Sequence, residues 1–247
     1  MNPLKSILLA GMRRRLPGFG FATAKLFPSG IIATNKYGVT MQLNPYEAVE
    51  GSVLMDGYFD EPVLNGILMH LQPDDVVWDV GANVGLHSLA IKKLKPTAHV
   101  YAFEPFSRNF ERLCINQQLN PDLPIHKFNL ALGTRVSIAK LYTTPRNAGR
   151  TSLQPLQHTQ TTEVAVATIA GDDLVLHQIP QPQVIKLDTE GTELEILMGC
   201  ASILKDTALR VVIYESFTQQ QEIKTLLSSH GFTIKAIDTV SNFIAIR

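Results

Sequence analysis

The sequence predicts one open α/β sheet, mostly parallel, with helices on both faces. Short apolar runs alternate with segments of helical spacing over most of the 247 residues. Several of these runs end in an acidic residue, which places polar groups at the carboxyl edge of the sheet, where ligands bind. Two further apolar runs close the chain and predict a terminal antiparallel hairpin added to the sheet.

Residues 1–60 are expected to form a cap, and residues 61–247 the domain that contains the sheet. Residues 1–30 are basic and punctuated by glycine and proline, and their start resembles a poor signal peptide with arginines at the expected cleavage site. We therefore expect a basic amphipathic helix, with attachment to a membrane surface as the alternative. Residues 31–44 alternate weakly around a Tyr-Gly pair, which predicts a short hairpin.

The domain after residue 60 repeats the order strand, loop, helix. Apolar residues three and four apart after Pro62 predict its first helix, and Ser107 suits the cap of a later one. The polar stretch at 143–162 is rich in turn residues and predicts a loop. The elements expected are a helix at 62–71, a strand at 76–79, a helix at 86–94, a strand at 99–103, a helix at 108–119, a strand at 125–132, an antiparallel ribbon of 136–142 with 164–169, a strand at 184–187, a helix at 194–201, a strand at 209–214, a helix around 223–227, and a hairpin of 232–237 with 243–246.

Composition and charge argue against several classes of function. The chain has 22 basic and 22 acidic residues, so it lacks the basic excess typical of nucleic-acid-binding proteins. No apolar run is long enough to form a transmembrane helix. The two cysteines, Cys114 and Cys200, are associated with helical patterns and are expected to be buried small apolar residues in a reducing compartment. We therefore expect a cytoplasmic protein with a small-molecule partner.

The stretch from Asp79 to Gly85 joins a strand to a helix and carries the strongest functional signal. A dinucleotide-binding loop has its middle glycine where this chain has Asn83, because the backbone there must approach a pyrophosphate. The missing glycine and the negative charge of Asp79, expected on the rim of the site, disfavour a diphosphate and suit a cationic ligand. S-adenosylmethionine carries a sulfonium and an ammonium group and meets that requirement. An NAD-type dehydrogenase and a non-catalytic nucleoside-binding protein are the alternatives.

Acidic residues end the neighbouring strands. Glu104 closes the second core strand, where a carboxylate accepts hydrogen bonds from both hydroxyls of a ribose. Asp188 ends the fourth core strand and is expected to face the reactive end of the ligand. Glu190 and Glu193 lie near the start of the next helix, where acids also suit the helix dipole. Three acids within six residues exceed what capping requires, and Lys186 is placed to neutralise them.

Five motifs follow one another along the chain: DVGANVG (79–85), FEP (103–105), NLALG (129–133), RTSL (150–153) and KLDTEGTELEIL (186–197). Together they resemble the FkbM family of S-adenosylmethionine-dependent methyltransferases, over roughly residues 55–215. The resemblance implies a Rossmann-like class I methyltransferase fold with a seven-stranded sheet in the order 3-2-1-4-5-7-6. It also implies O-methylation of a hydroxyl on a sugar, a glycolipid or a secondary metabolite.

The resemblance further implies roles for individual residues. Those expected at the cofactor are Asp79, Gly81, Asn83 and Gly85 on the methionine part, Glu104 on the ribose, and Asn129 and Ala131 near the adenine. Asp188 and Glu190 belong to the family's acidic motif beside the transferred methyl group. Residues 168–174 depart from the family's threonine–leucine–aspartate pattern, which leaves the role of Asp172 open.

A hydroxyl acceptor must lose a proton, which calls for a catalytic base. Asp188, within the acidic motif that includes Glu190, is one candidate, and His158 in the polar loop is another. His87 begins a helix and is expected to pack rather than react. A Mg²⁺ ion held by Asp188 and Glu215 is a rival mechanism that we do not favour, because two carboxylates at a sheet edge are weak evidence.

No motif identifies the methyl acceptor, and the fold does not specify a substrate. Its contacts are expected from residues 1–60 and 143–162. The tripeptide Asn44-Pro45-Tyr46 resembles a motif of amino-directed methyltransferases, but it lacks a second proline and precedes the first core strand, so a turn is expected there. Because the chain is neutral, we expect a small hydroxylated acceptor and no nucleic acid.

Overall fold

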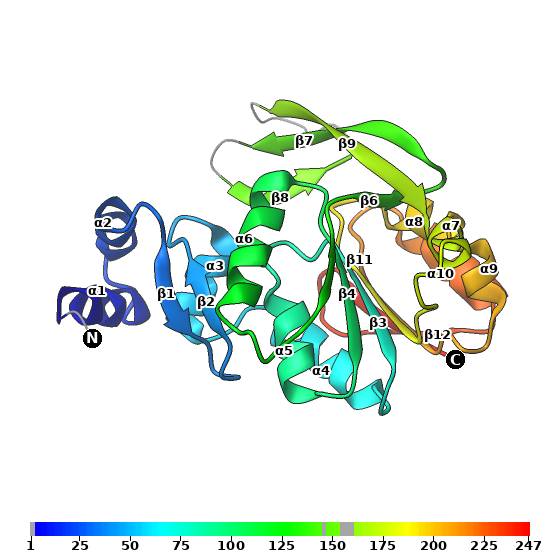
Figure 1. Ribbon diagram of the computed structural model, residues 1–247, viewed down its shortest axis with the longest axis horizontal. Helices are drawn as coiled ribbons and strands as arrows, with labels where there is room; N and C mark the ends of the chain where they lie inside the picture. Colours follow the sequence, from blue (N-terminus) through cyan, green and yellow to red (C-terminus); the bar gives the residue numbers. More distant parts are fainter. Residues whose placement is uncertain (1–2, 145–146, 154–160) are drawn as a thin grey trace.

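The largest of the three sheets confirms the predicted α/β architecture (Figure 1). The computed structural model describes residues 3–144, 147–153 and 161–247. The strand order β12-β13-β11-β10-β3-β4-β5 is the order 3-2-1-4-5-7-6 read from the β5 edge. All neighbours are parallel except β13, which runs antiparallel to β11 and β12. The strands are β3 (Val76–Val80), β4 (His99–Phe103), β5 (His126–Phe128), β10 (Val184–Leu187), β11 (Val211–Glu215), β12 (Thr233–Ala236) and β13 (Asn242–Ile246).

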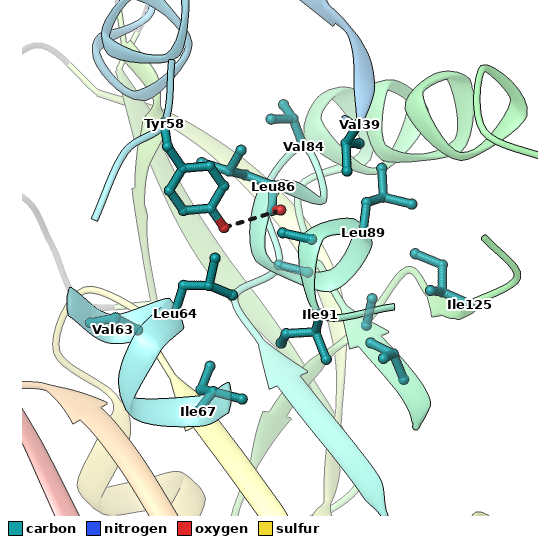
Figure 2. Packing of buried hydrophobic residues seen from close by; sticks show 14 of the residues in the cluster. Val39, Tyr58, Val63, Leu64, Ile67, Val84, Leu86, Leu89, Ile91 and Ile125 are labelled. Atoms are coloured by element: carbon teal, nitrogen blue, oxygen red, sulfur yellow. Dashed lines mark hydrogen bonds between the residues drawn. The ribbon is translucent and has the colours of Figure 1, made fainter. Parts of the chain in front are cut away.

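Helices cover both faces of this sheet because successive apolar residues of its strands point to opposite sides. Val77 belongs to one buried hydrophobic cluster and its neighbour Trp78 to the other. Figure 2 shows the first cluster, where Leu64 of α4 and Leu89 of α5 are fully buried. The first cluster includes residues of α4 (Glu61–His70), α5 (Leu86–Leu94) and α6 (Ser107–Gln118), and the second includes residues of α7 (Gly171–Leu176), α8 (Glu193–Met198), α9 (Ala201–Lys205) and α10 (Gln220–Ser229).

A four-stranded sheet of order β6-β9-β7-β8 lies across one end of the larger sheet (Figure 1). The predicted antiparallel ribbon is confirmed by the pairing of β7 with β9. Two expectations need correction. The strand expected at 125–132 divides into β5 and β6, because the chain leaves one sheet and joins the other. The loop expected at 143–162 contains β8, because the edge of β7 offers unpaired backbone groups to a polar segment with no alternation of its own. The strands are β6 (Ala131–Gly133), β7 (Ser137–Thr144), β8 (Asn147–Ser152) and β9 (Thr162–Ala170).

The N-terminal part of the chain forms helices α1 (Pro3–Arg13), α2 (Phe19–Leu26) and α3 (Ala48–Asp56) around a hairpin of β1 (Ile31–Thr34) and β2 (Thr40–Leu43). The predicted basic helix and hairpin are both confirmed. Met12, Val39 and Met41 share a buried cluster with Leu89 of the larger domain. The boundary at residue 60 stays a prediction, and across it the two parts share one core.

Two asparagine side chains, one in α6 and one just after its end, bind the outer edge of β2, which would otherwise present unpaired backbone groups. Asn116 accepts a hydrogen bond from the Gln42 amide (2.8 Å) and donates to the Val84 carbonyl (2.9 Å). Asn120 accepts from the Thr40 amide (3.0 Å) and donates to the Thr40 carbonyl (2.7 Å). The side chains of Asn116 and Asn120 come from positions four residues apart, and they bind alternate residues of the strand, Gln42 and Thr40.

Several smaller expectations are settled by packing. His87 is buried edge-on against Tyr58, with 5.7 Å between ring centroids, which confirms its packing role. Asn44 forms the expected turn by accepting a hydrogen bond from the Tyr46 amide (3.0 Å). Cys200 is buried as predicted, whereas Cys114 is only half-buried, because its position on α6 lies beside the packed stripe. Within the described residues, no helix is long and apolar enough to cross a membrane.

Asp172, whose role the sequence left open, holds the start of α9. Its carboxylate accepts hydrogen bonds from the amides of Ser202 (2.8 Å) and Ile203 (3.1 Å). These amides belong to the first turn of the helix, where backbone donors lack partners within the helix. Asp172 is therefore a structural residue in this chain.

We predict that Asn116→Ala lowers the free energy of unfolding by about 2–3 kcal/mol, because it leaves a partly buried amide and a buried carbonyl without partners. Urea denaturation measures this change. The control is Gln118→Ala on the exposed side of α6, which should stay within about 0.5 kcal/mol of the wild type. Equal effects of the two substitutions would contradict the role assigned to Asn116.

Candidate active site

A cavity opens at the carboxyl ends of β3, β4 and β10, on both sides of the central strand where the strand order reverses. Leu141 and Leu153 line it from the four-stranded sheet. The residues that line it at or just after the ends of β3, β4 and β10, and in the passage from β5 to β6, are Val80, Gly81, Asn83, Phe103, Glu104, Pro105, Leu130, Ala131, Leu132, Asp188, Thr189 and Glu190.

The loop after β3 presses against the end of β10 at Gly81. A Cβ atom at this position would lie 1.9 Å from the Asp188 carbonyl oxygen, and the residue has a φ of +78°. Glycine is therefore required here by contact between two protein segments. The next turn places Asn83 in the left-handed region, with its amide donating to Glu104 (2.8 Å). Gly85, also left-handed, precedes α5 and packs against Leu113 behind the cavity.

Asp79 does not lie on the rim of the cavity as expected. It is fully buried, and its carboxylate lies 3.0 Å from the Lys186 ammonium and accepts a hydrogen bond from the Ser88 hydroxyl (2.5 Å). Burial raises the pKa of Asp79, but Lys186, His87 and the Ser88 hydrogen bond together keep the pKa below its ordinary value. The expectation fails because Asp79 shares the side of β3 with Val77 and points toward α5.

Of the three acids that the sequence expected Lys186 to neutralise, it pairs with Asp188, and it also pairs with Asp79. Its ammonium lies between Asp79 and Asp188, 3.4 Å from the Asp188 carboxylate, and donates to the Gly81 carbonyl (3.4 Å). Burial lowers the pKa of Lys186, and the two carboxylates raise it above its ordinary value. The lysine is therefore charged, and it ties the ends of β3 and β10 together.

Glu104 is buried in the wall of the cavity. Its two oxygens accept hydrogen bonds from the amides of Asn83 (2.8 Å) and Phe106 (2.9 Å). Burial raises the pKa of Glu104 to about 7, and these backbone donors oppose the shift. Each carboxylate oxygen has a second lone pair, so the group is able to accept two further hydrogen bonds.

Asp188 and Glu190 both line the cavity, as the sequence predicts for the end of β10. The Asp188 side chain is 39% exposed, which leaves it accessible to a ligand. The Ser152 hydroxyl, at the end of β8, donates to the Glu190 carbonyl (2.8 Å). Glu193 instead turns back and accepts hydrogen bonds from the amides of Thr189 (2.9 Å) and Gly191 (3.1 Å). It orders the loop that presents the other two acids.

The remaining expected site residues divide between the cavity and its support. Ala131 lines the cavity. Asn129 is exposed and donates to the carbonyls of Glu104 (2.8 Å) and Pro105 (3.1 Å), so it holds two residues of the wall in place. His158 lies outside the described residues.

Two further carboxyl groups adjoin Asp188. The register of β10 and β11 pairs Leu187 with Tyr214, so Asp188 and Glu215 are the next neighbours. Burial and Asp188 raise the pKa of Glu215 to about 8, and burial and Asp188 also raise the pKa of Asp60 to about 6.

Among the residues that the structure describes, no three His, Cys, Asp or Glu side chains are arranged to hold a metal ion.

The sequence did not single out Asp60, Asn109 or Leu141, and Leu153 appeared there only as the last residue of the RTSL motif. Asn109 is buried in the first turn of α6 and lines the cavity. Asn109 comes five residues after Glu104 in the sequence, and this closeness to an expected ribose-binding residue could have identified it. Asp60 and Leu141 come from distant segments, so no local pattern identifies them.

Several known proteins similar to this chain are methyltransferases. The family model for the methyltransferase FkbM domain matches residues 79–234, more than half of the chain. The hexuronic acid methyltransferase AglP of Haloferax volcanii is 31% identical in an alignment that covers 68% of each chain. Methyltransferase 1 of Beauveria bassiana is 24% identical, with 66% of this chain and 74% of that protein covered.

Solved structures of similar shape include ribosomal protein L11 methylase from Lactobacillus delbrueckii subsp. bulgaricus, with a TM-score of 0.47, 16% identity and 75% of each chain covered. Aeropyrum pernix fibrillarin, solved with natively bound S-adenosyl-L-methionine, aligns with a TM-score of 0.45 at 12% identity and covers 75% of this chain and 72% of its own.

We predict that Gly81→Ala lowers the free energy of unfolding by more than about 3 kcal/mol, because the added methyl group meets a backbone carbonyl and φ is positive. Gly231→Ala is the control, since its φ of +86° is similar but no atom lies within 4 Å of the added Cβ. It should cost only about 1 kcal/mol. Chemical denaturation compares the two, and similar losses would show that φ alone requires glycine at position 81.

Proposed function

This chain belongs to the FkbM family of S-adenosylmethionine-dependent methyltransferases, and we propose that it methylates a hydroxyl oxygen of a sugar, a glycolipid or a secondary metabolite. The observation that carries the proposal is the cavity at the strand-order reversal, with Asp188 and Glu190 accessible in its wall. The relative from Haloferax volcanii is named for the methylation of a hexuronic acid, which supports a sugar acceptor. Because the chain belongs to this family, the NAD-type dehydrogenase considered from the sequence is excluded.

The lining of the cavity fits the cofactor part by part. Glu104 has free lone pairs for the two ribose hydroxyls. The apolar side chains of Phe103, Leu130 and Leu132 provide walls for the adenine ring. Asp188 and Glu190 carry the charge that attracts the ammonium and sulfonium groups. Asp79 contributes indirectly, by holding Lys186 and the loop after β3 in place.

The cofactor supplies an activated methyl group on a positively charged sulfur. The chain has to align the acceptor oxygen with that methyl group, and good alignment lowers the barrier by about 7–11 kcal/mol. Asp188 accepts the hydroxyl proton on a carboxylate oxygen as the oxygen reacts. Glu190 lies in the same wall, and His158 stays a second proposed base. Leu141 and Leu153, which line the cavity from the four-stranded sheet, exclude water from it.

The proposal is tested by incubating the chain with S-adenosylmethionine and a panel of hexuronic acids, neutral sugars and glycolipids. We expect a methyl ether, identified by mass spectrometry. Asp188→Asn should lower kcat by about 10²–10⁴-fold, because it removes the proton acceptor, with a smaller effect on cofactor Kd. The matched control is Glu163→Gln, which makes the same chemical change in an exposed ion pair with Lys140.

Several outcomes would contradict the proposal. Methylation on nitrogen or carbon would exclude an O-methyltransferase. Cofactor binding with no product from any hydroxylated acceptor would favour a non-catalytic binding protein. Equal losses of kcat and cofactor affinity in Asp188→Asn would make Asp188 a binding residue.

We predict that cofactor affinity weakens as the pH falls below about 7, the raised pKa of Glu104. Below that pH the carboxyl group gains a proton and loses acceptor sites for the ribose hydroxyls, so the apparent Kd rises by up to about tenfold per pH unit. Calorimetry with S-adenosylhomocysteine at several pH values measures this. Glu104→Gln should bind more weakly and lose the dependence, while an affinity unchanged or improved at low pH would show that Glu104 does not hold the ribose.

A further inference from the structure

The positive charge of this neutral chain is concentrated at its N-terminal end. Residues 1–46 contain six basic residues and no acidic one, although the whole chain has 22 of each kind. The described part of this segment forms α1, α2, β1 and β2, at one end of the molecule (Figure 1). The six residues are Lys5, Arg13, Arg14, Arg15, Lys25 and Lys36.

The same segment exposes an excess of large apolar side chains. Of sixteen such residues exposed in the described part of the chain, seven lie before residue 47. These seven are Leu4, Ile7, Leu16, Phe21, Leu26, Ile32 and Tyr46. Less than a fifth of the chain thus carries nearly half of the exposed large apolar side chains. We call these seven residues, together with the basic residues up to Lys25, the N-terminal face.

Contacts between the elements hold this face together. Leu4 and Ile7 lie one turn apart on α1, and Arg14 directly follows the end of that helix. The Lys5 ammonium donates to the Ile32 carbonyl and so joins α1 to β1. The rings of Phe21 and Tyr46 meet edge-on, with centroids 6.1 Å apart, and join α2 to the turn after β2.

Helix α2 also packs directly on α1. A Cβ atom at Gly11 would lie 2.0 Å from the Phe19 ring, which shows how closely the two helices approach. Salt bridges from Arg108 to Glu47 (3.3 Å) and from Arg112 to Glu50 (2.5 Å) connect α6 to the turn and helix that follow β2. The face is therefore firmly attached to the domain that contains the cavity.

We propose that the N-terminal face docks on the surface of an anionic lipid bilayer. Exposed leucine, isoleucine and aromatic side chains next to arginine and lysine suit the boundary between headgroups and acyl chains. The positive charge complements anionic headgroups. A nucleic acid would satisfy the charge but offers little apolar surface to seven large side chains. This proposal does not depend on the identity of the methyl acceptor.

The test is cosedimentation of the full chain with vesicles of phosphatidylcholine mixed with phosphatidylserine, and with phosphatidylcholine vesicles alone. We expect binding to the anionic vesicles that weakens as NaCl is raised. Arg13→Gln combined with Arg14→Gln should weaken binding about 30-fold, since each basic residue near the surface contributes about one kcal/mol. Ile7→Ser combined with Phe21→Ser should weaken it by more than about tenfold.

Matched controls alter the same kinds of residue on other surfaces. Lys205→Gln with Lys235→Gln removes two exposed charges, and Leu176→Ser with Met198→Ser removes two exposed apolar side chains. Both controls should bind as the wild type does. Circular dichroism checks that each variant is folded, and the salt dependence of the wild type tests the proposal without any variant.

Three results would overturn the proposal. The first is that the wild-type chain does not sediment with anionic vesicles, or that the substitutions in the N-terminal face leave its binding unchanged. The second is tight binding to single-stranded RNA that survives Ile7→Ser and Phe21→Ser, which would indicate a nucleic-acid surface. The third is a wild-type dimer in sedimentation velocity that those two substitutions make monomeric, which would show that a second copy covers the face.

Discussion

Lys186 is a buried ammonium group between two carboxylates, and the ends of β3 and β10 depend on this arrangement. Moving such a charge out of water costs several kcal/mol, which only close and well-placed partners offset. Asp79 lies 3.0 Å from the ammonium and Asp188 lies 3.4 Å from it. The same ammonium donates to the carbonyl of Gly81, whose missing side chain lets the loop touch the end of β10. The floor of the cavity is thus held from both strands at once.

The acids near this lysine have different tasks because their surroundings differ. Asp79 is enclosed and serves the ion pair. Glu104 is enclosed but faces backbone amides, and it keeps lone pairs toward the cavity. Glu193 binds the loop of its own segment. Asp188 alone of these four combines partial exposure with a place in the cavity wall, and this is why the proposed proton transfer centres on it.

Helix α6 connects the cavity to the N-terminal face. Its first turn contributes Asn109 to the cavity, and its later turns bind β2 and α3 through Arg112 and Asn116. Glu50 is buried, and its ion pair with Arg112 offsets the cost of removing its carboxylate from water. Docking of the N-terminal face would therefore set the orientation of the cavity relative to a bilayer.

The sequence by itself determined the periodicity of the elements, the turns, and which residues end each strand. Those features are local, so the parallel sheet, the hairpins and the positions of Glu104, Asp188 and Glu190 were all predictable. The environment of each side chain was decided by tertiary structure. Asp79 looked like a rim residue until the direction of its side chain placed it under the loop beside Lys186, more than one hundred residues away in the chain. The polar segment that became β8 had no pattern of its own and took its form from the edge of β7. Burial and pairing depend on neighbours that only the folded chain brings together, and a local pattern contains no record of them.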